Sequence, residues 1–378
     1  MVERKQMRGG GVVAHLREWK GAQMSNGKSR RQRVIEEARR ILGSYDAVAE
    51  ALDEGLSPES FTGAELVGEE ERVPGTSVAR ALKEEASEAI DVGLEAMKKV
   101  EAGEDEDITP EDQQGLEAII LLAGRPAILI QDGDFMNPPK LWAGLKDVRQ
   151  QIQGVIRRVG RIEVAKHPDL EWVGTGWLAG KDVLFTNRHV AVEFSRRGAD
   201  GAWTFRAPMS ASLNMRAELG SEDALSFAIT SIIGIHEDHD LAVLRVEQTS
   251  GSERLPDPLP IAKQAPATLV GSKVYVVGFP AWDGRRNDPE PMKRIFQDIY
   301  NVKRLHPGEI SGDSLASFEI FHDCSTLGGN SGSPVVNLDT HQVIGLHFGG
   351  RFLEQNHAVP LWTLQNDELI KRAAIIFQ

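Results

Sequence analysis

From Arg161 to the C-terminus the chain is a series of short apolar runs separated by turn residues, and this pattern restricts its possible folds more than any other feature. The runs are rich in Val, Ile and Phe, are bounded by Gly, Pro and Asp, and cover residues 172–178, 183–187, 228–235, 241–246, 274–279, 318–322, 334–338 and 343–348. Many short strands at such spacing are typical of a β-sandwich or β-barrel. We therefore expect a mainly β fold for this part of the chain.

The chain has 378 residues and one cysteine, Cys324, so it can form no internal disulfide. A disulfide-stapled secreted scaffold is excluded, and the simplest expectation is a cytoplasmic protein in which Cys324 is a small buried residue. No apolar run approaches the ~20 residues that span a bilayer, and the N-terminus has no secretory signal pattern. We expect no membrane partner.

The net charge of −13 is concentrated in one stretch. Residues 1–43 carry 11 Lys and Arg against 4 Asp and Glu, residues 44–117 carry 5 against 22, and residues 118–378 carry 27 against 30. Because the large C-terminal part has no net positive charge, we expect no nucleic-acid partner.

The first 154 residues divide into three parts. Residues 1–28 are rich in Gly and Arg without periodicity, which predicts a disordered basic tail. In residues 29–123, apolar residues at helical spacing predict helices at 30–56 and 78–100, and Thr109 followed by Pro110 predicts the capped start of a third. We interpret this acidic helical domain as a partner-binding or regulatory module. Residues 124–154 are a connecting segment, with a strand at 127–130 and a helical pattern over 141–159, and a last helix is expected at 361–377.

Three segments carry chemically useful side chains. His189 follows a hydrophobic strand, Asp240 opens another, and Ser331 lies in a glycine-walled loop. A serine hydroxyl needs a base to act as a nucleophile, an imidazole can take its proton near neutral pH, and a carboxylate can fix the imidazole tautomer. The backbone N–H groups of Gly329 and Ser331 can stabilise the oxyanion of a tetrahedral intermediate, because glycine leaves the loop unobstructed. The sequence therefore predicts a catalytic triad with an oxyanion hole.

The stretch from about Val155 to Gln378 resembles the trypsin/chymotrypsin-like serine proteases. It matches them in four motifs, Gly-Thr-Gly-Trp-Leu at 174–178, Thr-Asn-Arg-His at 186–189, Asp-Leu-Ala at 240–242 and Gly-Asn-Ser-Gly-Ser-Pro at 329–334. The resemblance implies a chymotrypsin-like double β-barrel at residues 155–378, with His189 and Asp240 on the first barrel and Ser331 on the second. It also implies a polypeptide substrate and no cofactor. In secreted zymogens of this family an aspartate precedes the serine and pairs with a freed N-terminus; Asn330 stands here, so we do not expect that activation route.

The expected specificity pocket resembles that of bacterial glutamyl endopeptidases. Those enzymes have a similar Asp-x-Ser-Thr-x-Gly-Gly-Asn-Ser-Gly-Ser-Pro run and an Ile-Gly-x-His-x-Gly-Gly strand, matched here by residues 323–334 and 344–350. In that family the histidine and threonine that match His347 and Thr326 help to bind a substrate glutamate. A buried carboxylate needs hydrogen-bond donors, which both residues carry. The resemblance predicts an acidic residue at P1, the substrate position before the cut bond, and Gly349 and Gly350 leave space for the substrate backbone to pair as a strand.

Alternative functions remain open. The same fold can be a catalytically idle peptide-binding module or an esterase. The cluster His236–Asp240 lacks the His-Glu-x-x-His spacing of a zinc helix, so we expect a turn there and no metal. If the enzyme cuts after Glu, Glu69–Glu71 and Glu104–Asp107 are candidate sites for autoprocessing between the helical domain and the protease.

Overall fold

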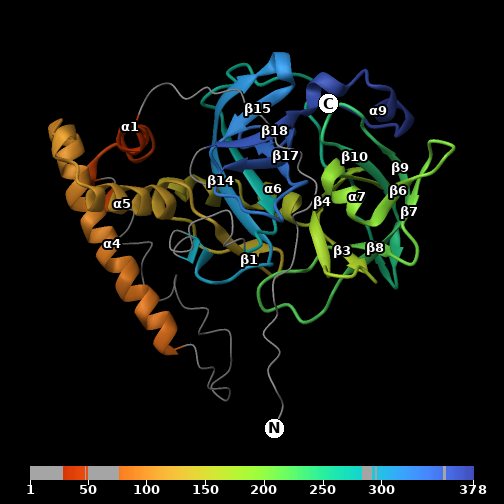
Figure 1. The fold of residues 1–378 in the computed structure, drawn as a ribbon, viewed down its shortest axis with the longest axis horizontal. Helices are drawn as coiled ribbons and strands as arrows, with labels where there is room; N and C mark the ends of the chain where they lie inside the picture. The colour runs from red at the N-terminus through yellow and green to blue at the C-terminus, as the bar shows by residue number, and fades with distance from the viewer. Residues whose placement is uncertain (1–28, 47, 50–75, 283–291, 294–295, 352–354) are drawn as a thin grey trace, which may run out of the picture.

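The computed structural model describes residues 29–46, 48–49, 76–282, 292–293, 296–351 and 355–378. Two antiparallel six-stranded β-barrels lie next to each other, and a helical unit lies on the far side of the second barrel from the first (Figure 1). The architecture is the double barrel that the family resemblance implies. The basic tail predicted for residues 1–28 lies outside the described residues.

The first barrel is closed by six strands in the order β10-β5-β4-β3-β8-β9. Apolar side chains such as Ile162, Leu184 and Phe227 fill it and are almost wholly buried. The short helix α7 (Arg188–Phe194) follows β5. The strands are β3 (Val159–Ala165), β4 (Trp172–Gly180), β5 (Val183–Thr186), β8 (Ser210–Asn214), β9 (Ser226–Ile235) and β10 (Ala242–Val246), with small hairpins formed by β6 (Ser195–Arg197) and β7 (Trp203–Phe205), and by β11 (Thr249–Ser250) and β12 (Glu253–Arg254).

The second barrel follows the order β13-β16-β17-β18-β15-β14, and pairing of β13 with β14 closes it. Its strands are β13 (Lys273–Gly278), β14 (Arg304–Ser314), β15 (Glu319–His322), β16 (Pro334–Asn337), β17 (Val343–Arg351) and β18 (Gln355–Pro360), and the short turn η5 (Leu315–Ser317) joins β14 to β15. The connecting segment adds to this sheet, because β1 (Ile128–Gln131) pairs with β14 and with β2 (Asp134–Phe135).

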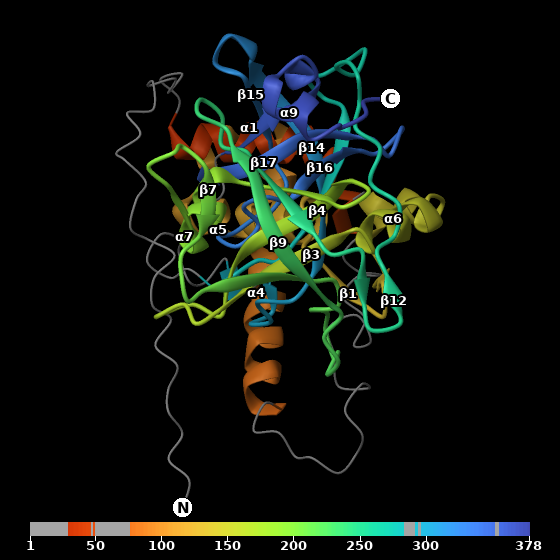
Figure 2. The same ribbon diagram turned by 90° about the vertical axis from the view of Figure 1, so that its right-hand side faces the viewer.

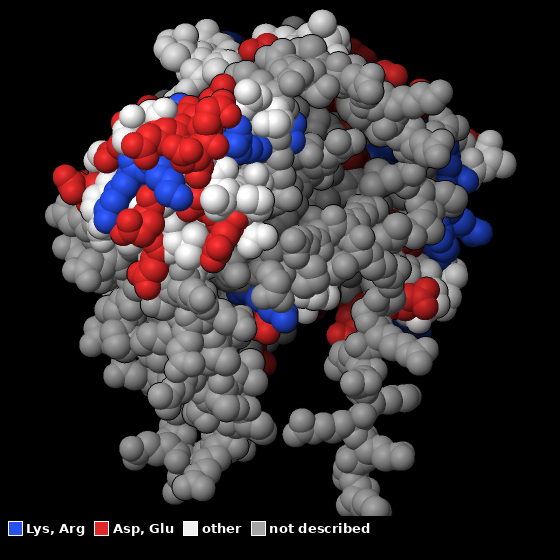
Figure 3. Space-filling view, turned by 60° about the vertical axis from the view of Figure 1, so that its left-hand side comes forward, with Lys and Arg blue, Asp and Glu red and all other residues white. Residues whose placement is uncertain are grey.

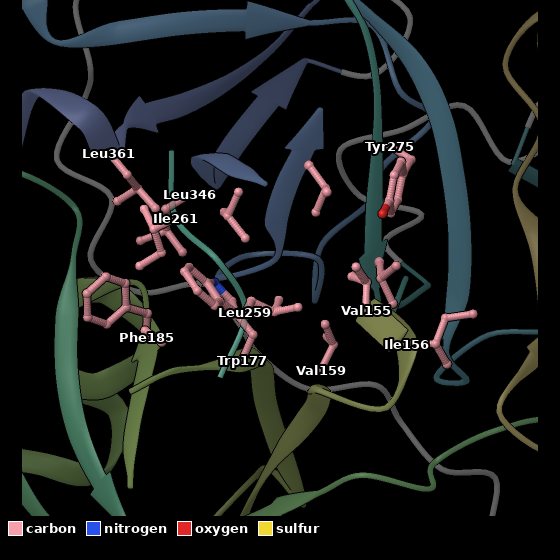
Figure 4. Close-up of a cluster of buried hydrophobic side chains, with 14 of the residues drawn as sticks. Val155, Ile156, Val159, Trp177, Phe185, Leu259, Ile261, Tyr275, Leu346 and Leu361 are labelled. Carbon is pink, nitrogen blue, oxygen red and sulfur yellow. The ribbon is translucent and has the colours of Figure 1, made fainter. Parts of the chain in front are cut away.

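One apolar cluster joins the two barrels. Trp177 and Phe185 from the first barrel share it with Tyr275 and Leu346 from the second, and the rings of Trp177 and Phe185 meet edge to face at 5.3 Å (Figure 4). The connecting helices η4 (Lys140–Lys146) and α6 (Arg149–Ile156) and the C-terminal helices η6 (Leu361–Leu364) and α9 (Glu368–Arg372) also contribute side chains. Because both barrels bury side chains in this cluster, close packing fixes one barrel against the other.

The helical unit has its own apolar core. It consists of α1 (Arg30–Leu42), α4 (Thr76–Ala102), η2 (Asp105–Asp107), α5 (Pro110–Ile119) and the π-helical turn η3 (Ile120–Gly124), with α4 projecting away from the barrels (Figure 2). The backbones of α4 and α5 touch at Gly93 and Gly115, where a Cβ on Gly93 would lie 2.4 Å from the Gly115 carbonyl oxygen. On the face shown in Figure 3, acidic side chains gather around a smaller group of basic ones.

The predicted strands all have counterparts in the structure, whereas several helices differ from prediction. Thr109 caps α5 and Pro110 opens it, as predicted. The first helix ends at Leu42, because Gly43 takes a positive φ of 71°. Residues 45–46 and 48–49 are again helical, and residues 47 and 50–56 of the predicted span lie outside the described residues. The pattern over 141–159 splits into η4 and α6 and then enters β3, and the last helix is reduced to η6 and α9. Among the described residues, no helix is both long and apolar enough to cross a bilayer.

Candidate active site

The two neighbouring strands β5 and β10 bring His189 and Asp240 together. Ala242 pairs with Thr186, so the end of β5 and the start of β10 lie at the same edge of the first barrel. His189 is the second residue of α7, just past this edge. Its Nδ1 lies 2.7 Å from Oδ2 of Asp240, and its backbone N–H donates to Oδ1 at 3.0 Å. One carboxylate therefore holds both the ring and the backbone of His189.

The loop before β10 is fixed by the residues that precede His189. The buried side-chain amide of Asn187 donates to the Asp240 carbonyl at 2.8 Å, and the guanidinium of Arg188 donates to the carbonyl of His239. Burial alone would raise the pKa of the Asp240 carboxyl, but its hydrogen bonds with His189 outweigh this effect and lower that pKa below the ordinary value. Asp240 is therefore held as a carboxylate.

The Ser331 loop belongs to the second barrel and is hydrogen-bonded to the first through Thr175 of β4. The Thr175 N–H donates to the Ser331 carbonyl at 2.9 Å, and its hydroxyl donates to the Gly329 carbonyl at 2.8 Å. Gly332 has a φ of 91°, and a Cβ there would lie 2.1 Å from the Thr175 carbonyl oxygen. The loop can approach β4 this closely only because residue 332 is glycine.

Gly174 lies between the histidine and serine segments. A Cβ at this position would lie 2.8 Å from Cγ2 of Val190, the residue after His189, and 3.0 Å from the carbonyl oxygen of Ser331. The two segments thus pack against the same glycine from different barrels. His189, Asp240 and Ser331 are each partly exposed.

The predicted oxyanion donors are free to bind a ligand. Among the described residues, no acceptor faces the backbone N–H of Gly329 or Ser331. Gly329 has a φ of 85°, and a Cβ there would collide with the Phe279 carbonyl oxygen and the Trp172 ring, both at 2.5 Å. Between them, Asn330 is fully buried, and neither polar atom of its side chain has a hydrogen-bond partner within the described part of the chain.

The pocket histidine His347 lies in a row of buried histidines. Its Nδ1 is 3.1 Å from Nε2 of His322, and its own Nε2 has no partner among the residues described. Burial lowers the pKa of His347 well below its ordinary value, with a further contribution from His322. Burial likewise lowers the pKa of His322 and of His306 to about 3. These imidazoles are neutral at physiological pH. Each therefore has one ring N–H that can donate a hydrogen bond and one ring nitrogen that can accept one.

The predicted wall of the pocket, Cys324–Leu327, is held by Asn356 of β18. The Asn356 side-chain amide donates to the Cys324 carbonyl at 2.7 Å, and its Oδ1 accepts from the Thr326 hydroxyl at 2.7 Å. Thr326 thus gives its only hydroxyl hydrogen to the protein and not to the pocket. Cys324 is buried and unpaired, as predicted, and burial raises the pKa of its thiol.

The two glycines of β17 differ in their surroundings. Among the described residues, nothing lies within 4 Å of a Cβ placed on Gly349, whereas a Cβ on Gly350 would meet Oδ1 of Asn356 at 2.3 Å. Gly349 therefore has open space beside it among these residues, while the missing side chain of Gly350 allows β18 to approach.

The predicted turn at His236–Asp240 is present, and His236 is engaged within the protein. Its Nδ1 accepts from the backbone N–H groups of Asp238 and His239, and its Nε2 lies 3.1 Å from Asp367. No group of three or more His, Cys, Asp or Glu side chains in the described part of the chain is arranged to hold a metal ion.

Comparison with known proteins identifies relatives of this chain. A family model described as a trypsin-like peptidase domain matches residues 174–346. A "Probable serine protease" from Lysobacter enzymogenes is 33% identical over 282 residues, which cover 65% of this chain and 72% of that protein. A glutamyl endopeptidase from Staphylococcus epidermidis is 28% identical over 190 residues, covering 49% of this chain and 57% of that protein. The solved serine endoprotease from Yersinia pestis has a TM-score of 0.39 and 19% identity, covering 59% of this chain and 66% of that one.

The family assignment rests on the family model and the Lysobacter relative. The model spans the segments that contain His189, Asp240 and Ser331, and the identity to the Lysobacter protein extends over nearly three quarters of that protein. The two closed barrels of the structure have the architecture that the family resemblance implies. The chain belongs to the trypsin-like peptidases and is a serine endopeptidase, with a polypeptide as its substrate.

Proposed function

We propose that Ser331, His189 and Asp240 form the catalytic triad of this endopeptidase. Ser331 attacks the peptide carbonyl while His189 takes its proton as general base. The protonated His189 then gives that proton to the leaving amine, and a water molecule repeats the sequence on the acyl-enzyme. Asp240 fixes the tautomer of His189 and stabilises its charged form.

One observation carries this proposal. Asp240 binds His189 through both of its oxygens, and Thr175 ties the Ser331 loop to the same barrel. An activated nucleophile needs a base that is itself oriented by a third group, and these contacts supply the orienting part of that arrangement. The backbone N–H groups of Gly329 and Ser331 have no hydrogen-bond partner among the described residues, which supports their role as oxyanion donors, because such donors must be free before the charge develops.

We further propose that the enzyme prefers an acidic residue at P1, with His347 as the donor that binds it. If Nδ1 of His347 accepts from His322, the free Nε2 carries the hydrogen and can donate to a substrate carboxylate. The name of the staphylococcal relative, a glutamyl endopeptidase, supports the same preference. Thr326 contributes to the pocket as part of the wall.

A fluorophosphonate probe tests the triad, because it labels an activated serine. Wild type should be labelled and Ser331→Ala should not. Absence of labelling in wild type, including refolded and partner-supplemented samples, would favour a catalytically idle peptide-binding module on the same fold.

A peptide library tests the substrate class. Cleavage after Glu is the expected dominant product, and indifference to the charge at P1 would end the proposal of an acidic pocket. Hydrolysis of esters with no cut peptides would indicate an esterase instead.

The remaining parts of the proposal concern the whole chain. We propose a protease domain at residues 155–378, a helical domain at 29–123 that regulates it through a protein partner, and an intracellular location. The single cysteine supports a reducing compartment, and the separate apolar core of α1, α4 and α5 supports a distinct helical unit. Cell fractionation tests the location, and copurification with the full chain tests the partner.

A further inference from the structure

Five charged side chains meet where α1 contacts the second barrel, and we call them the Arg40 network. Arg40 of α1 pairs with Glu37 at 2.7 Å, with Glu309 of β14 at 2.5 Å and with Asp323, directly after β15, at 2.5 Å. Arg125, which follows the helical unit, pairs with Glu37 and with Asp323. In Figure 1 the helical unit lies on the β14 side of the second barrel, where this network forms.

Asp323 links the network to the substrate pocket. It immediately precedes the wall Cys324–Leu327, and only 4% of its side chain is exposed. Its Oδ1 accepts from the Glu309 N–H at 2.7 Å, and its Oδ2 accepts from Arg40. A buried carboxylate is costly unless it is paired, so the position of Asp323 depends on the cations beside it.

The wall is therefore supported from two sides. On the side of the barrel, Asn356 bonds to Cys324 and Thr326. On the opposite side, the helical unit and its exit supply Arg40 for Asp323 and the Arg125 carbonyl, which accepts from the buried hydroxyl of Ser325 at 2.7 Å. Cys324 and Thr326 thus bond to the second barrel, whereas Ser325 between them bonds to Arg125 at the exit of the helical unit.

We propose that Arg40 is a positioning residue for the substrate pocket: through Asp323 it holds the pocket wall in its binding-competent position. The helical unit is then a structural part of the active enzyme, and its displacement lowers substrate affinity. This inference rests on the proposed function, since it takes Cys324–Leu327 as the wall that meets the P1 side chain. It adds to the proposed regulation a specific contact, between Arg40 and Asp323, and a direction, because loss of this contact lowers substrate affinity.

The neighbouring Arg39 provides a matched control on the same helix. It is 43% exposed against 38% for Arg40, but it bonds to Asp105 and to the Val100 carbonyl, both inside the helical unit. Arg40→Ala removes the ion pairs with Glu309 and Asp323 of the barrel, whereas Arg39→Ala removes an ion pair inside the helical unit without touching the barrel. Arg40→Lys restores one charged contact and tests for rescue.

The experiment compares these three full-length variants by hydrogen exchange and by kinetics on the best library peptide. In Arg40→Ala, exchange of residues 319–329 should accelerate about tenfold while β17 keeps its protection. KM should rise about tenfold with kcat within about threefold, because the triad contacts are untouched. Arg39→Ala should stay within about twofold of wild type, and Arg40→Lys should recover part of the loss.

Several results would overturn the inference. These are identical behaviour of Arg40→Ala and Arg39→Ala, a uniform rise in exchange across both barrels, or a gain of activity in Arg40→Ala, which would indicate an inhibitory helical unit. If wild type proves to be no peptidase, the proposed function fails, but the exchange of residues 319–329 still decides whether Arg40 supports the wall.

Discussion

The two carboxylate oxygens of Asp240 bond to different atoms of His189, so this residue fixes both the ring and the chain of the proposed base. In Asp240→Asn, the amide nitrogen can occupy the site that faces Nδ1 and would favour the wrong imidazole tautomer. We expect kcat to fall about 10³- to 10⁴-fold with little change in KM. Steady-state kinetics on a peptide substrate measures both.

Asp238→Asn is the control for that prediction. Asp238 lies in the same turn and is exposed, and it contacts His236 only through its backbone N–H. The same charge is removed without any change at His189, so activity should remain within about twofold of wild type. Equal losses in the two variants would mean that the net charge of the turn, and not the orientation of His189, governs the rate.

The pocket offers a second prediction for single residues, because His347 and Thr326 differ in available hydrogens. His347→Phe removes the free donor and should reduce the ratio of kcat/KM for Glu over Gln at P1 by at least about tenfold. Thr326→Val should leave that ratio within about threefold, since its hydroxyl hydrogen already goes to Asn356. A loss in Thr326→Val equal to that in His347→Phe would show that the hydroxyl turns toward the substrate.

Motif residues could be named from sequence, whereas their supporting partners could not. His189, Asp240 and Ser331 each lie in a short recognisable run, and Thr175 was visible only as part of such a run. His322 and Asn356 carry no local signal. They come from separate strands, and only the pairing of β15 with β18 and of β18 with β17 places them behind the pocket.

At the scale of elements, β14 shows why the strand prediction was incomplete. The sequence of β14, Arg304–Ser314, contains proline, glycine and charged residues, so it has no alternating apolar pattern. Its first residues are nevertheless buried, and Arg304 gives its hydrogens to the carbonyls of Ala127, Phe296 and Ile299. One of these partners, Ala127, is 177 residues away in the chain, so no local sequence window contains it.

The histidines on β14, β15 and β17 predict that acid destabilises the fold. Burial lowers the pKa of His306 and His322 to about 3, and that of His347 also falls well below its ordinary value. Unfolded histidines have a pKa of about 6.5, so below this pH the unfolded chain binds protons that the folded chain does not. These histidines therefore make their full contribution to stability above pH ~6.5. As the pH falls below this value, the free energy of unfolding decreases by up to about 1.4 kcal/mol per pH unit for each histidine.

Urea unfolding between pH 6.5 and 5.0 measures this slope with little contribution from carboxylates. His306→Gln removes one of the titrating groups, so its slope should be smaller than that of wild type by up to about 1.4 kcal/mol per pH unit. Equal slopes in the two proteins would mean that His306 binds protons equally in the folded and unfolded states, so that burial does not lower its pKa.

For the whole molecule, the contacts of the helical unit determine whether the two fragments stay together after the chain is cut. Ile35, Ala38 and Leu42 of α1 are buried in the core shared with α4 and α5, and Arg40 adds ion pairs to the second barrel. These contacts do not depend on an intact peptide link between α1 and α4. The sequence predicted the helices but not this docking, because the partners of Arg40 in the barrel, Glu309 and Asp323, are more than 200 residues away in the chain.

Autoprocessing after Glu therefore predicts a cut protein that stays assembled. Of the two candidate sites, Glu69–Glu71 lie outside the described residues, whereas Asp105 and Glu106 are held in a short helix by ion pairs with Arg39 and Arg31. Because a protease needs an extended substrate, we do not expect cleavage at the second site, which leaves Glu69–Glu71 as the candidate.

Incubated wild type should show a shortened chain on a denaturing gel, while gel filtration under native conditions gives one peak of unchanged size. Ser331→Ala should remain full length, and a Gln substitution of all three glutamates at 69–71 should block the cut without reducing activity on peptides. Wild type that stays intact while cleaving other Glu substrates would contradict autoprocessing. Release of the N-terminal fragment on gel filtration would contradict the docking of α1, since the buried face and the Arg40 pairs would then be too weak to hold it.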